Sequence, residues 1–282
     1  MPRTLRNKPL THAAACSGSA EVGGAQSIQR GLQVLRHVAA QPKGCRLRDV
    51  TIACDLNKAT AHRILTALVV EGFLHLDAAT HVYELGQEAQ IIGWSSRARQ
   101  DIRALAQRSL IRICRASGDT VFLSLRTGIE AVCIDRHVGD FPIKTLTLEV
   151  GSRRPLGIGA GSLALLAFLP DDEIDEILKM SRSALALYPL LPIDAIRALT
   201  REARQQGYSF NNERVVAGMS AVGVPVLEKN GRPIAAISVA AITSRMTPQH
   251  IASIVQWLKE ESTQLSDSRQ MEGTAASVRH TE

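Results

Sequence analysis

The stretch that most constrains the fold of this chain is Leu47–Gly72, with the sequence LRDVTIACDLNKATAHRILTALVVEG. Its pattern predicts one helix from about Arg48 to Cys54 and a second from Lys58 to about Glu71. Asp55-Leu56 forms the tight turn between them, because aspartate tolerates the left-handed conformation that such turns often need. Asn57 is a favourable N-cap for the second helix. The stretch is therefore typical of a helix-turn-helix.

The second predicted helix has two different faces. At about 100° per residue, one arc is apolar and consists of Ala61, Ile64, Leu65, Leu68 and Val69. The opposite arc is small and polar, and its candidate DNA-binding residues are Lys58, Ala59, Thr60, His62, Arg63 and Thr66. Lys58 and the amide end of the helix can hold phosphates, and Arg63 can donate two hydrogen bonds to guanine. The alternative is a helical hairpin whose polar face is merely solvated.

A β-hairpin is predicted directly after this helix. Phe73–Leu76 and His81–Leu85 alternate as strands, and the residues between them, 77–80, suit a turn. Before the helix-turn-helix, Ser27 is expected to cap a helix that runs from Ile28 to Ala40. Three helices and a hairpin form a winged helix-turn-helix domain over residues 25–85, whose expected partner is the major groove of double-stranded DNA.

The charge of the chain is concentrated in its first quarter. The 282 residues are enough for two domains, and the net charge is +6. Residues 1–70 contain ten Lys or Arg and three Asp or Glu, a balance of +7, so the remaining residues balance at −1. This distribution is typical of a polyanion-binding module attached to a neutral body. Aromatic residues make up only 4%, which argues against stacking platforms for single strands.

Five cysteines, at positions 16, 45, 54, 114 and 133, show neither a CxxC pair nor a Cys/His spacing typical of zinc. We therefore expect no metal site, and we interpret the cysteines as small apolar residues in a reducing compartment. No apolar run approaches the length of a membrane span, and no signal sequence is recognisable. The sequence predicts a soluble cytoplasmic protein without membrane contact.

The rest of the chain predicts an α+β protein with a helical connector. Residues 1–24 and 266–282 are expected to be disordered tails, and residues 86–117 a helical linker with helices at Gln87–Trp94 and Arg97–Ala116. Residues 118–265 read as one domain with an antiparallel-rich sheet. Its predicted strands are Thr120–Arg126, Glu130–His137, Lys144–Glu149, Tyr208–Asn211, Ala221–Leu227 and Pro233–Ala241. Its predicted helices are Gly161–Phe168, Asp171–Lys179, Ile193–Gln206 and a last one capped by Thr247.

Six ordered blocks cover most of the chain from Ser27 to Arg245: LNKATAHRILTALVVEGF (56–73), YELG (83–86), GSRRPLGIGAGSLALLAFLP (151–170), GYSFNNE (207–213), GMSAVGVPV (218–226) and GRPIAAISVA (231–240). Together they resemble the IclR (isocitrate-lyase-regulator) family of transcriptional regulators. The resemblance implies a winged helix-turn-helix followed by a GAF/profilin-like effector-binding domain. It also implies homodimers or dimers of dimers, no cofactor and no enzymatic activity.

The resemblance further implies a pocket between the sheet and the loop before the Gly161–Phe168 helix. The matching effector-binding positions are Ile158, Gly159, Ala160, Gly161, Ser162, Leu163, Asn211, Ala221, Ser238 and Ala240. Ser162-Leu163 replaces a usual Gly-Lys, and Asn211 stands where Asp is frequent. Ala221 and Ala240 stand where Cys and a second Ser are frequent. Because these departures remove polar groups, they leave the identity of the ligand open.

The glycines at 157, 159 and 161 lack the pattern of a nucleotide-binding loop. Glycines before a helix let backbone N–H groups approach an anion, so the expected effector is a small organic acid. Arg153 and Arg154 lie a few residues earlier, where either could face solvent. The alternatives are that the glycines only permit tight helix-to-sheet packing, and that Ser238 only bonds the backbone.

Two other functions remain open from the sequence. A GAF-like enzyme would need a nucleophile with a base, and the nearest candidates are Cys133 and His137. At i and i+4 of a strand these side chains would lie about 13 Å apart, too far for a direct bond. A redox-sensing regulator could use Cys114 or Cys133, although no basic surroundings are visible in the sequence.

Overall fold

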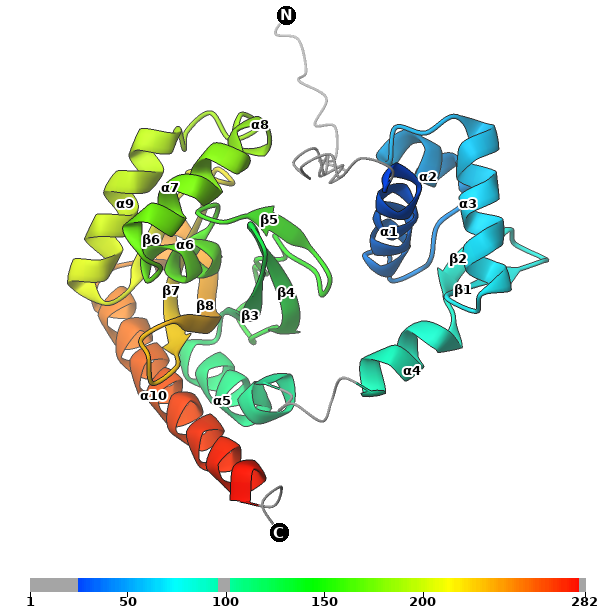
Figure 1. Cartoon of the computed structure of the whole chain (residues 1–282). Coiled ribbons are helices and arrows are strands. Elements are labelled where there is room, and N and C mark those ends of the chain that lie inside the picture. The colour runs from blue at the N-terminus through cyan, green and yellow to red at the C-terminus, as the bar shows by residue number, and fades with distance from the viewer. Residues whose placement is uncertain (1–24, 96–101, 279–282) are drawn as a thin grey trace, which may run out of the picture. The chain divides into compact units, whose positions relative to one another are not determined.

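The computed structural model describes residues 25–95 and 102–278 (Figure 1). The chain divides into two compact units, residues 1–89 and 90–282. The predicted tail 1–24, the predicted start of the connector helix at Arg97, and residues 279–282 lie outside the described residues.

The first unit contains three helices and a two-stranded sheet: α1 (Gln26–Ala39), α2 (Leu47–Ala53), α3 (Lys58–Val70), β1 (Leu74–Asp77) and β2 (Val82–Leu85). Its core includes Val34 and Val38 of α1, Val50 of α2, and Ala61 and Leu65 of α3. The apolar arc predicted for the second helix of the motif is therefore the buried one.

The local signals of the helix-turn-helix are confirmed. Asp55 adopts a left-handed φ of 50° in the turn, and the Asn57 side chain accepts the Thr60 N–H at 2.8 Å. The predicted cap at Ser27 is wrong, because α1 already begins at Gln26 and the capping position is Ala25. Ser27 therefore lies within the first turn, where its hydroxyl makes no capping hydrogen bond.

The hairpin after α3 is also confirmed, with β1 antiparallel to β2. A third segment joins it, since Cys45 exchanges two backbone hydrogen bonds with Tyr83, at 2.8 and 3.0 Å. The Asp77 carboxylate accepts the Ala79 N–H and the Thr80 hydroxyl and so shapes the turn. The short bridge fastens the wing to the segment between α1 and α2, and the Asp77 bonds close the turn of the wing.

The second unit is built on one antiparallel sheet in the order β5-β4-β3-β8-β7-β6. The strands are β3 (Thr120–Thr127), β4 (Glu130–His137), β5 (Arg153–Pro155), β6 (Ser209–Asn212), β7 (Met219–Leu227) and β8 (Pro233–Ile242). The central pair, β3 and β8, aligns Thr120 with Ala240. Two strands predicted at opposite ends of this domain are therefore neighbours at its centre.

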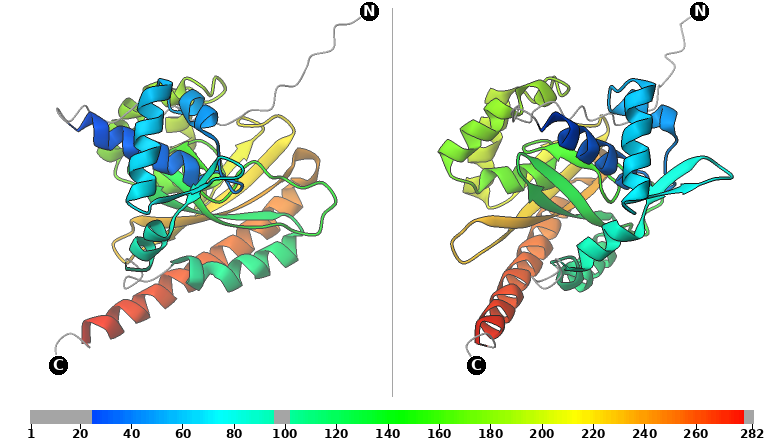
Figure 2. Two further views of the ribbon diagram at one scale, coloured as in Figure 1. Left: turned by 90° about the vertical axis from the view of Figure 1, so that its right-hand side faces the viewer. Right: turned by 45° about the vertical axis from the view of Figure 1, so that its right-hand side comes forward.

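Helices cover both faces of this sheet (Figures 1 and 2). One face carries α6 (Ala160–Ala167), α7 (Asp171–Met180), α8 (Arg182–Leu185) and α9 (Ile193–Gln206). The other face carries α5 (Ile102–Ser117) and α10 (Pro248–Val278), which pack on the strand residues Leu123, Val224 and Ile237. The connector helix α4 (Gln87–Ser95) precedes α5. The predicted α+β class is confirmed.

One predicted strand is wrong. Residues 144–149 form a loop, and the edge of the sheet is β5 instead. The sequence alternates in this segment as it would in a strand, but the polar Thr145 is buried while the apolar Leu146 faces solvent. The loop has arginine side chains in place of a strand partner: Arg136 donates to the Leu148 carbonyl and Arg154 to the Thr147 carbonyl.

The last helix is longer than expected. The Thr247 hydroxyl caps it by accepting the His250 N–H at 3.2 Å, as predicted. It continues through Val278, whereas we expected the chain to fray from residue 266. Ser266 and Ser268 donate to carbonyls one turn earlier, so these hydroxyls are satisfied within the helix. A single glycine at 273 costs a helix only about 1 kcal/mol and does not end it.

Candidate functional site

The six predicted DNA-binding residues lie on the first three turns of α3. Five of them are exposed, and only Thr60, whose N–H is held by the Asn57 cap, is half-buried. Ala61 and Leu65 point the other way, into the core. The helix therefore presents one uninterrupted polar face.

The cations on this face have no acidic partner among the residues that the structure describes. Lys58 and Arg63 take part in none of the ion pairs found among residues 25–95 and 102–278. The helix itself contains no Asp or Glu, so its N-terminal end keeps its partial positive charge. Lys58 can hold a phosphate, and Arg63 can make a bidentate contact with a base edge.

The second unit contains a cavity at the start of α6. Nine of the ten predicted effector-binding residues line it: Ile158, Gly159, Ala160, Gly161, Ser162, Asn211, Ala221, Ser238 and Ala240. Leu163 does not, because it packs into the core between the sheet and helices α6, α7 and α9. Residues more than 80 positions apart in the chain therefore converge on one hollow.

The floor of the cavity follows from strand register. Phe122 of β3 lies opposite Ser238 of β8, and in the neighbouring row Asn211 of β6 lies opposite Ala221 of β7. Because side chains alternate across a strand, these residues share one face of the sheet. Among the described residues, the side-chain amide of Asn211 and the hydroxyl of Ser238 make no hydrogen bond, so both are available to bind a ligand.

The glycines before and within α6 have different roles. A Cβ atom on Gly161 would lie 3.1 Å from the Ser238 hydroxyl, and one on Gly157 would lie 2.7 Å from the Ile196 side chain. Tight packing therefore accounts for these two. Gly159 is the N-cap of α6 with φ of 88°, and a Cβ there would approach Nη1 of Arg154 at 3.2 Å. The backbone at Gly159 thus stays open toward the cavity.

Ser162 has a structural role at this turn. Its hydroxyl donates to the Pro155 carbonyl at 2.9 Å and accepts the Gly157 N–H at 3.1 Å. Ser209 likewise donates to the Ala160 carbonyl at 2.6 Å and ties α6 to β6. These bonds fix the start of α6 against the sheet.

The two arginines before α6 differ sharply. Arg153 donates to the Glu130 carboxylate at 2.9 Å. Arg154 lines the cavity, is only 7% exposed, and has a pKa lowered by burial. Its Nη2 donates to the Thr147 carbonyl at 2.8 Å, and its buried Nε has no hydrogen-bond partner in the described part of the chain. Of the two, only Arg154 belongs to the cavity, and the sequence did not separate them.

The cavity includes further residues that the sequence did not reveal: Phe122, Ser124, Ala131, Cys133, Thr145, Thr147, Leu148, Ser152, Val215, Val216, Met219 and Ser220. Alternation along β3 and β4 could have indicated the strand residues among them. Thr145, Thr147 and Leu148 could not be found, because their segment alternates like a strand and is held by long-range bonds from Arg136 and Arg154.

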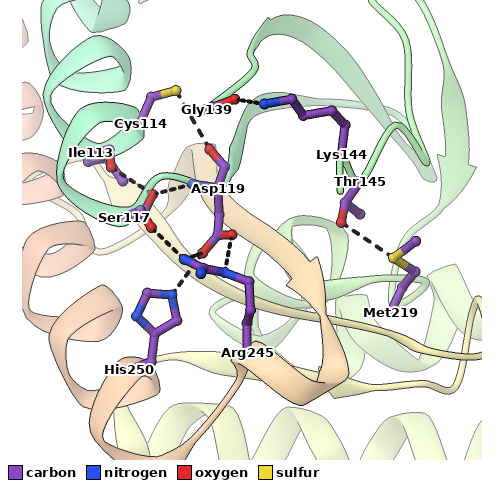
Figure 3. A network of polar contacts seen from close by, with 10 residues as sticks. All are labelled: Ile113, Cys114, Ser117, Asp119, Gly139, Lys144, Thr145, Met219, Arg245 and His250. Atoms are coloured by element: carbon purple, nitrogen blue, oxygen red, sulfur yellow. Dashed lines mark hydrogen bonds and ion pairs between the residues drawn. The ribbon is translucent and has the colours of Figure 1, made fainter. Parts of the chain in front are cut away.

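A buried carboxylate links this loop region to two helices (Figure 3). The Asp119 side chain, 2% exposed, contacts Arg245 Nε at 2.8 Å and His250 Nε2 at 2.7 Å. Arg245 lies in the short helix η2 (Thr243–Arg245) and also covers the Phe141 ring at 3.9 Å. The Thr145 hydroxyl of the same loop contacts the Met219 sulfur at 3.3 Å. These contacts connect the segment between β4 and β5 to η2 through Phe141 and to β7 through Thr145.

The thiols do not support the redox or enzymatic alternatives. Cys45, Cys54, Cys114 and Cys133 are all buried. Burial raises the pKa of the Cys133 thiol to about 11 and also raises the pKa of Cys114, so neither forms a reactive thiolate near neutral pH. Cys133 Sγ donates to the Asp135 carbonyl oxygen at 3.4 Å rather than contacting His137.

In residues 25–95 and 102–278, no cluster of three or more His, Cys, Asp or Glu side chains is placed to hold a metal ion. No helix in that part of the chain is both long and apolar enough to cross a membrane.

Comparison with known families gives two matches. Residues 27–78 match the IclR helix-turn-helix domain, and residues 95–267 match the family described as bacterial transcriptional regulator IclR C-terminal. Among curated relatives, the HTH-type transcriptional repressor AllR of Klebsiella pneumoniae is 28% identical, over 86% of this chain and 89% of its own length. The HTH-type transcriptional regulator XynR of Escherichia coli K12 is 27% identical, over 86% and 96%.

Solved structures give the same fold. A putative regulator of this type from Silicibacter has a TM-score of 0.72 at 24% identity and covers 86% of this chain and 96% of its own. A regulator from Alicyclobacillus acidocaldarius has a TM-score of 0.70 at 23% identity, over 86% and 97%. A homologue from Microbacterium hydrocarbonoxydans, complexed with 4-hydroxybenzoate, has a TM-score of 0.69 at 19% identity, over 87% and 99%.

Proposed function

The chain belongs to the IclR family of bacterial transcriptional regulators, and from that premise we propose that a small organic acid in the cavity of the second unit controls operator binding by α3. As a family member it is a DNA-binding transcriptional regulator with an effector-binding domain, and it is not an enzyme. The relatives AllR and XynR are likewise named as regulators.

The proposed DNA contacts are those of the exposed α3 face, within a DNA-binding domain of residues 25–85. Arg63 and Thr60 read base edges, while Lys58 and the helix N-terminus hold phosphates. Because one recognition helix covers only a few base pairs, the working species is a homodimer, or a dimer of dimers, on a near-palindromic operator. Such a regulator acts in the cytoplasm, where the DNA is.

The proposed effector site is the cavity of residues 118–265, joined to the DNA-binding domain by the linker 86–117. One observation carries this proposal: nine residues from four separate sequence blocks line one cavity at the N-terminal end of α6. That end carries partial positive charge and has no side-chain cap among the described residues, which favours an anion. To regulate, the acid must bind two conformations of the protein unequally. A difference of about 1–3 kcal/mol changes operator affinity by roughly 5–150-fold.

The test has two stages. Fragments bound by the full chain are first selected from the genomic DNA of the source organism and footprinted. We expect a protected two-fold symmetric site, and a short asymmetric site bound by a monomer would contradict the dimer. A panel of small acids, including 4-hydroxybenzoate because the Microbacterium homologue was crystallised with it, is then titrated against the bound operator. A neutral compound that releases the operator when no acid does would contradict the proposed effector class.

A further inference from the structure

Arg154 carries the cavity's unbalanced charge. Of the residues that line the cavity, all of them within the described chain, Arg154 is the one with a charged side chain, and none is Asp or Glu. Within the described chain its guanidinium makes one hydrogen bond, to the Thr147 carbonyl, and its buried Nε makes none. Arg154 is also absent from the ion pairs of the described residues.

Two other arginines of the second unit have an acidic partner, which Arg154 lacks among the described residues. Arg153, one residue earlier, is paired with Glu130, and the half-buried Arg245 is paired with Asp119. A cation that is nine-tenths buried without a counterion loses its hydration, and no ion-pair attraction offsets that free-energy cost. Buried cations of this kind are typical of functional sites, and the ligand chemistry that complements a guanidinium is an anion.

The position of the guanidinium defines where that anion lies. Nη1 of Arg154 lies 3.2 Å from the place that a Cβ of Gly159 would occupy, beside the first amides of α6. Two sources of positive potential, the guanidinium and the helix N-terminus, thus meet at one point of the cavity wall. We propose that Arg154 anchors the effector's carboxylate between its guanidinium and the start of α6, so that Arg154 determines the chemical class of ligand this chain accepts. This inference rests on the proposed function, because it concerns the same cavity.

The remaining walls describe the rest of the ligand. Phe122, Val215 and Met219 are apolar and suit a flat or branched hydrocarbon body. Asn211 and Ser238 belong to β6 and β8, whereas Arg154 belongs to β5 at the opposite edge of the sheet. A second polar group on the ligand, such as a hydroxyl, can bind there. The class is therefore a monocarboxylate with an apolar or aromatic body; a dicarboxylate has no second cation among the lining residues.

The experiment uses matched pairs of an acid and its neutral amide: acetate and acetamide, benzoate and benzamide, 4-hydroxybenzoate and 4-hydroxybenzamide. Each is titrated into the full chain at constant ionic strength and followed by thermal shift and calorimetry. The proteins are wild type, Arg154→Met, Arg154→Lys and the control Arg153→Met, which removes the same charge one residue away. Arg154→Gln replaces Arg154→Met if the latter does not fold.

We expect at least one acid, but not its amide, to stabilise the wild type. Arg154→Met lowers the affinity for that acid by roughly 30-fold or more, and the ratio of acid to amide affinity falls toward one. Arg154→Lys keeps a point charge without the guanidinium fork and gives an intermediate value. Arg153→Met behaves as the wild type. The acid-to-amide ratio separates direct recognition of charge from a general loss of structure.

Two results would overturn the inference: no carboxylate stabilises the wild type, or one binds wild type and Arg154→Met equally. Operator release, measured in parallel, separates the two proposals. An acid that releases DNA from both proteins leaves the proposed function standing and removes Arg154 from the site. An acid that binds through Arg154 without affecting the operator supports the anchor and contradicts the regulatory proposal.

Discussion

The exposed face of α3 and the cavity at α6 use the same two components in opposite surroundings. Each combines the N-terminal end of a helix with an arginine that lacks an acidic partner in the described chain, Arg63 in one and Arg154 in the other. Arg63 is exposed, whereas Arg154 is almost completely buried. The α3 end is closed by the Asn57 side chain, whereas α6 begins at Gly159 with no side-chain cap.

This difference decides what kind of anion each site selects. An exposed cation keeps its water and binds a polyanion chiefly by releasing counterions, so salt governs the interaction. An enclosed cation has already lost its water, and its partner must fit the cavity and make direct hydrogen bonds. The same chemistry therefore gives broad attraction to DNA in one unit and recognition of one small molecule in the other.

Salt should separate the two sites most strongly. If a dimer makes about six phosphate contacts, its operator affinity falls by roughly a thousandfold between 50 and 200 mM salt. Binding of an acid in the cavity, where charges are screened much less, should change by no more than about threefold. Fluorescence anisotropy of labelled operator and calorimetry of the acid, over the same salt series, measure both. If the operator affinity and the acid affinity depended equally on salt concentration, the proposed distinction between the two sites would be wrong.

Gly159→Val should abolish binding of the acid, with a loss of roughly a hundredfold or more from the blocked contact. A branched side chain is strained at φ of 88°, at a cost of about 1–3 kcal/mol, and its Cβ would press on Arg154 at 3.2 Å. Calorimetry with the acid that stabilises the wild type measures the loss. Gly128→Val is a matched control, since Gly128 also has positive φ but nothing lies near its Cβ position. An intact response in Gly159→Val would locate the effector elsewhere.

Arg63→Ala should weaken operator binding by about 1–3 kcal/mol, or 5–150-fold, because one bidentate base contact is lost. Base preference should also relax at one position of each half-site. Arg30→Ala is a useful comparison, because it removes one positive charge from α1 rather than from α3. Selection of binding sites from random DNA with both variants measures the effect. Unchanged affinity in Arg63→Ala would remove this residue from the interface.

Asn57→Ala should have the smallest effect, a loss of about 1 kcal/mol in the stability of the first unit. The Thr60 N–H would lose its acceptor, and the start of α3 would open more often. Amide hydrogen exchange over residues 58–62 measures this opening, with exchange at the start of α6 as the internal control. If exchange at α3 does not accelerate, solvent replaces the Asn57 cap at no cost.

The sequence alone predicted the structure correctly where the interactions that determine it lie within a few residues of each other. Asp55, Asn57 and the apolar arc of α3 each act within a few residues, so the helix-turn-helix could be predicted from them alone. The same holds for the strands β3 and β4 and for the Thr247 cap. The failure at Ser27 is also local, because several adjacent residues could begin that helix at similar cost.

The sequence was insufficient where long-range partners decide the outcome. Residues 144–149 alternate like a strand, but β4 already pairs with β5 and two arginines take the loop's carbonyls. The sequence does not distinguish Arg153 from Arg154. The register of β5 on β4 places Arg153 against Glu130 and Arg154 in the cavity. The place of the Arg154 charge in the cavity therefore could not be predicted without the assembled sheet.

The pairing of β3 with β8 also governs the order in which the protein can form during its synthesis. Thr120 must meet Ala240, and Asp119 must meet His250, across more than a hundred intervening residues. The contacts of the first unit span far shorter separations, so that unit folds early and quickly while the chain is still being made. Until β8 arrives, β3 has an unpaired edge that invites aggregation. A nascent chain therefore has a folded DNA-binding domain long before its effector-binding domain can fold.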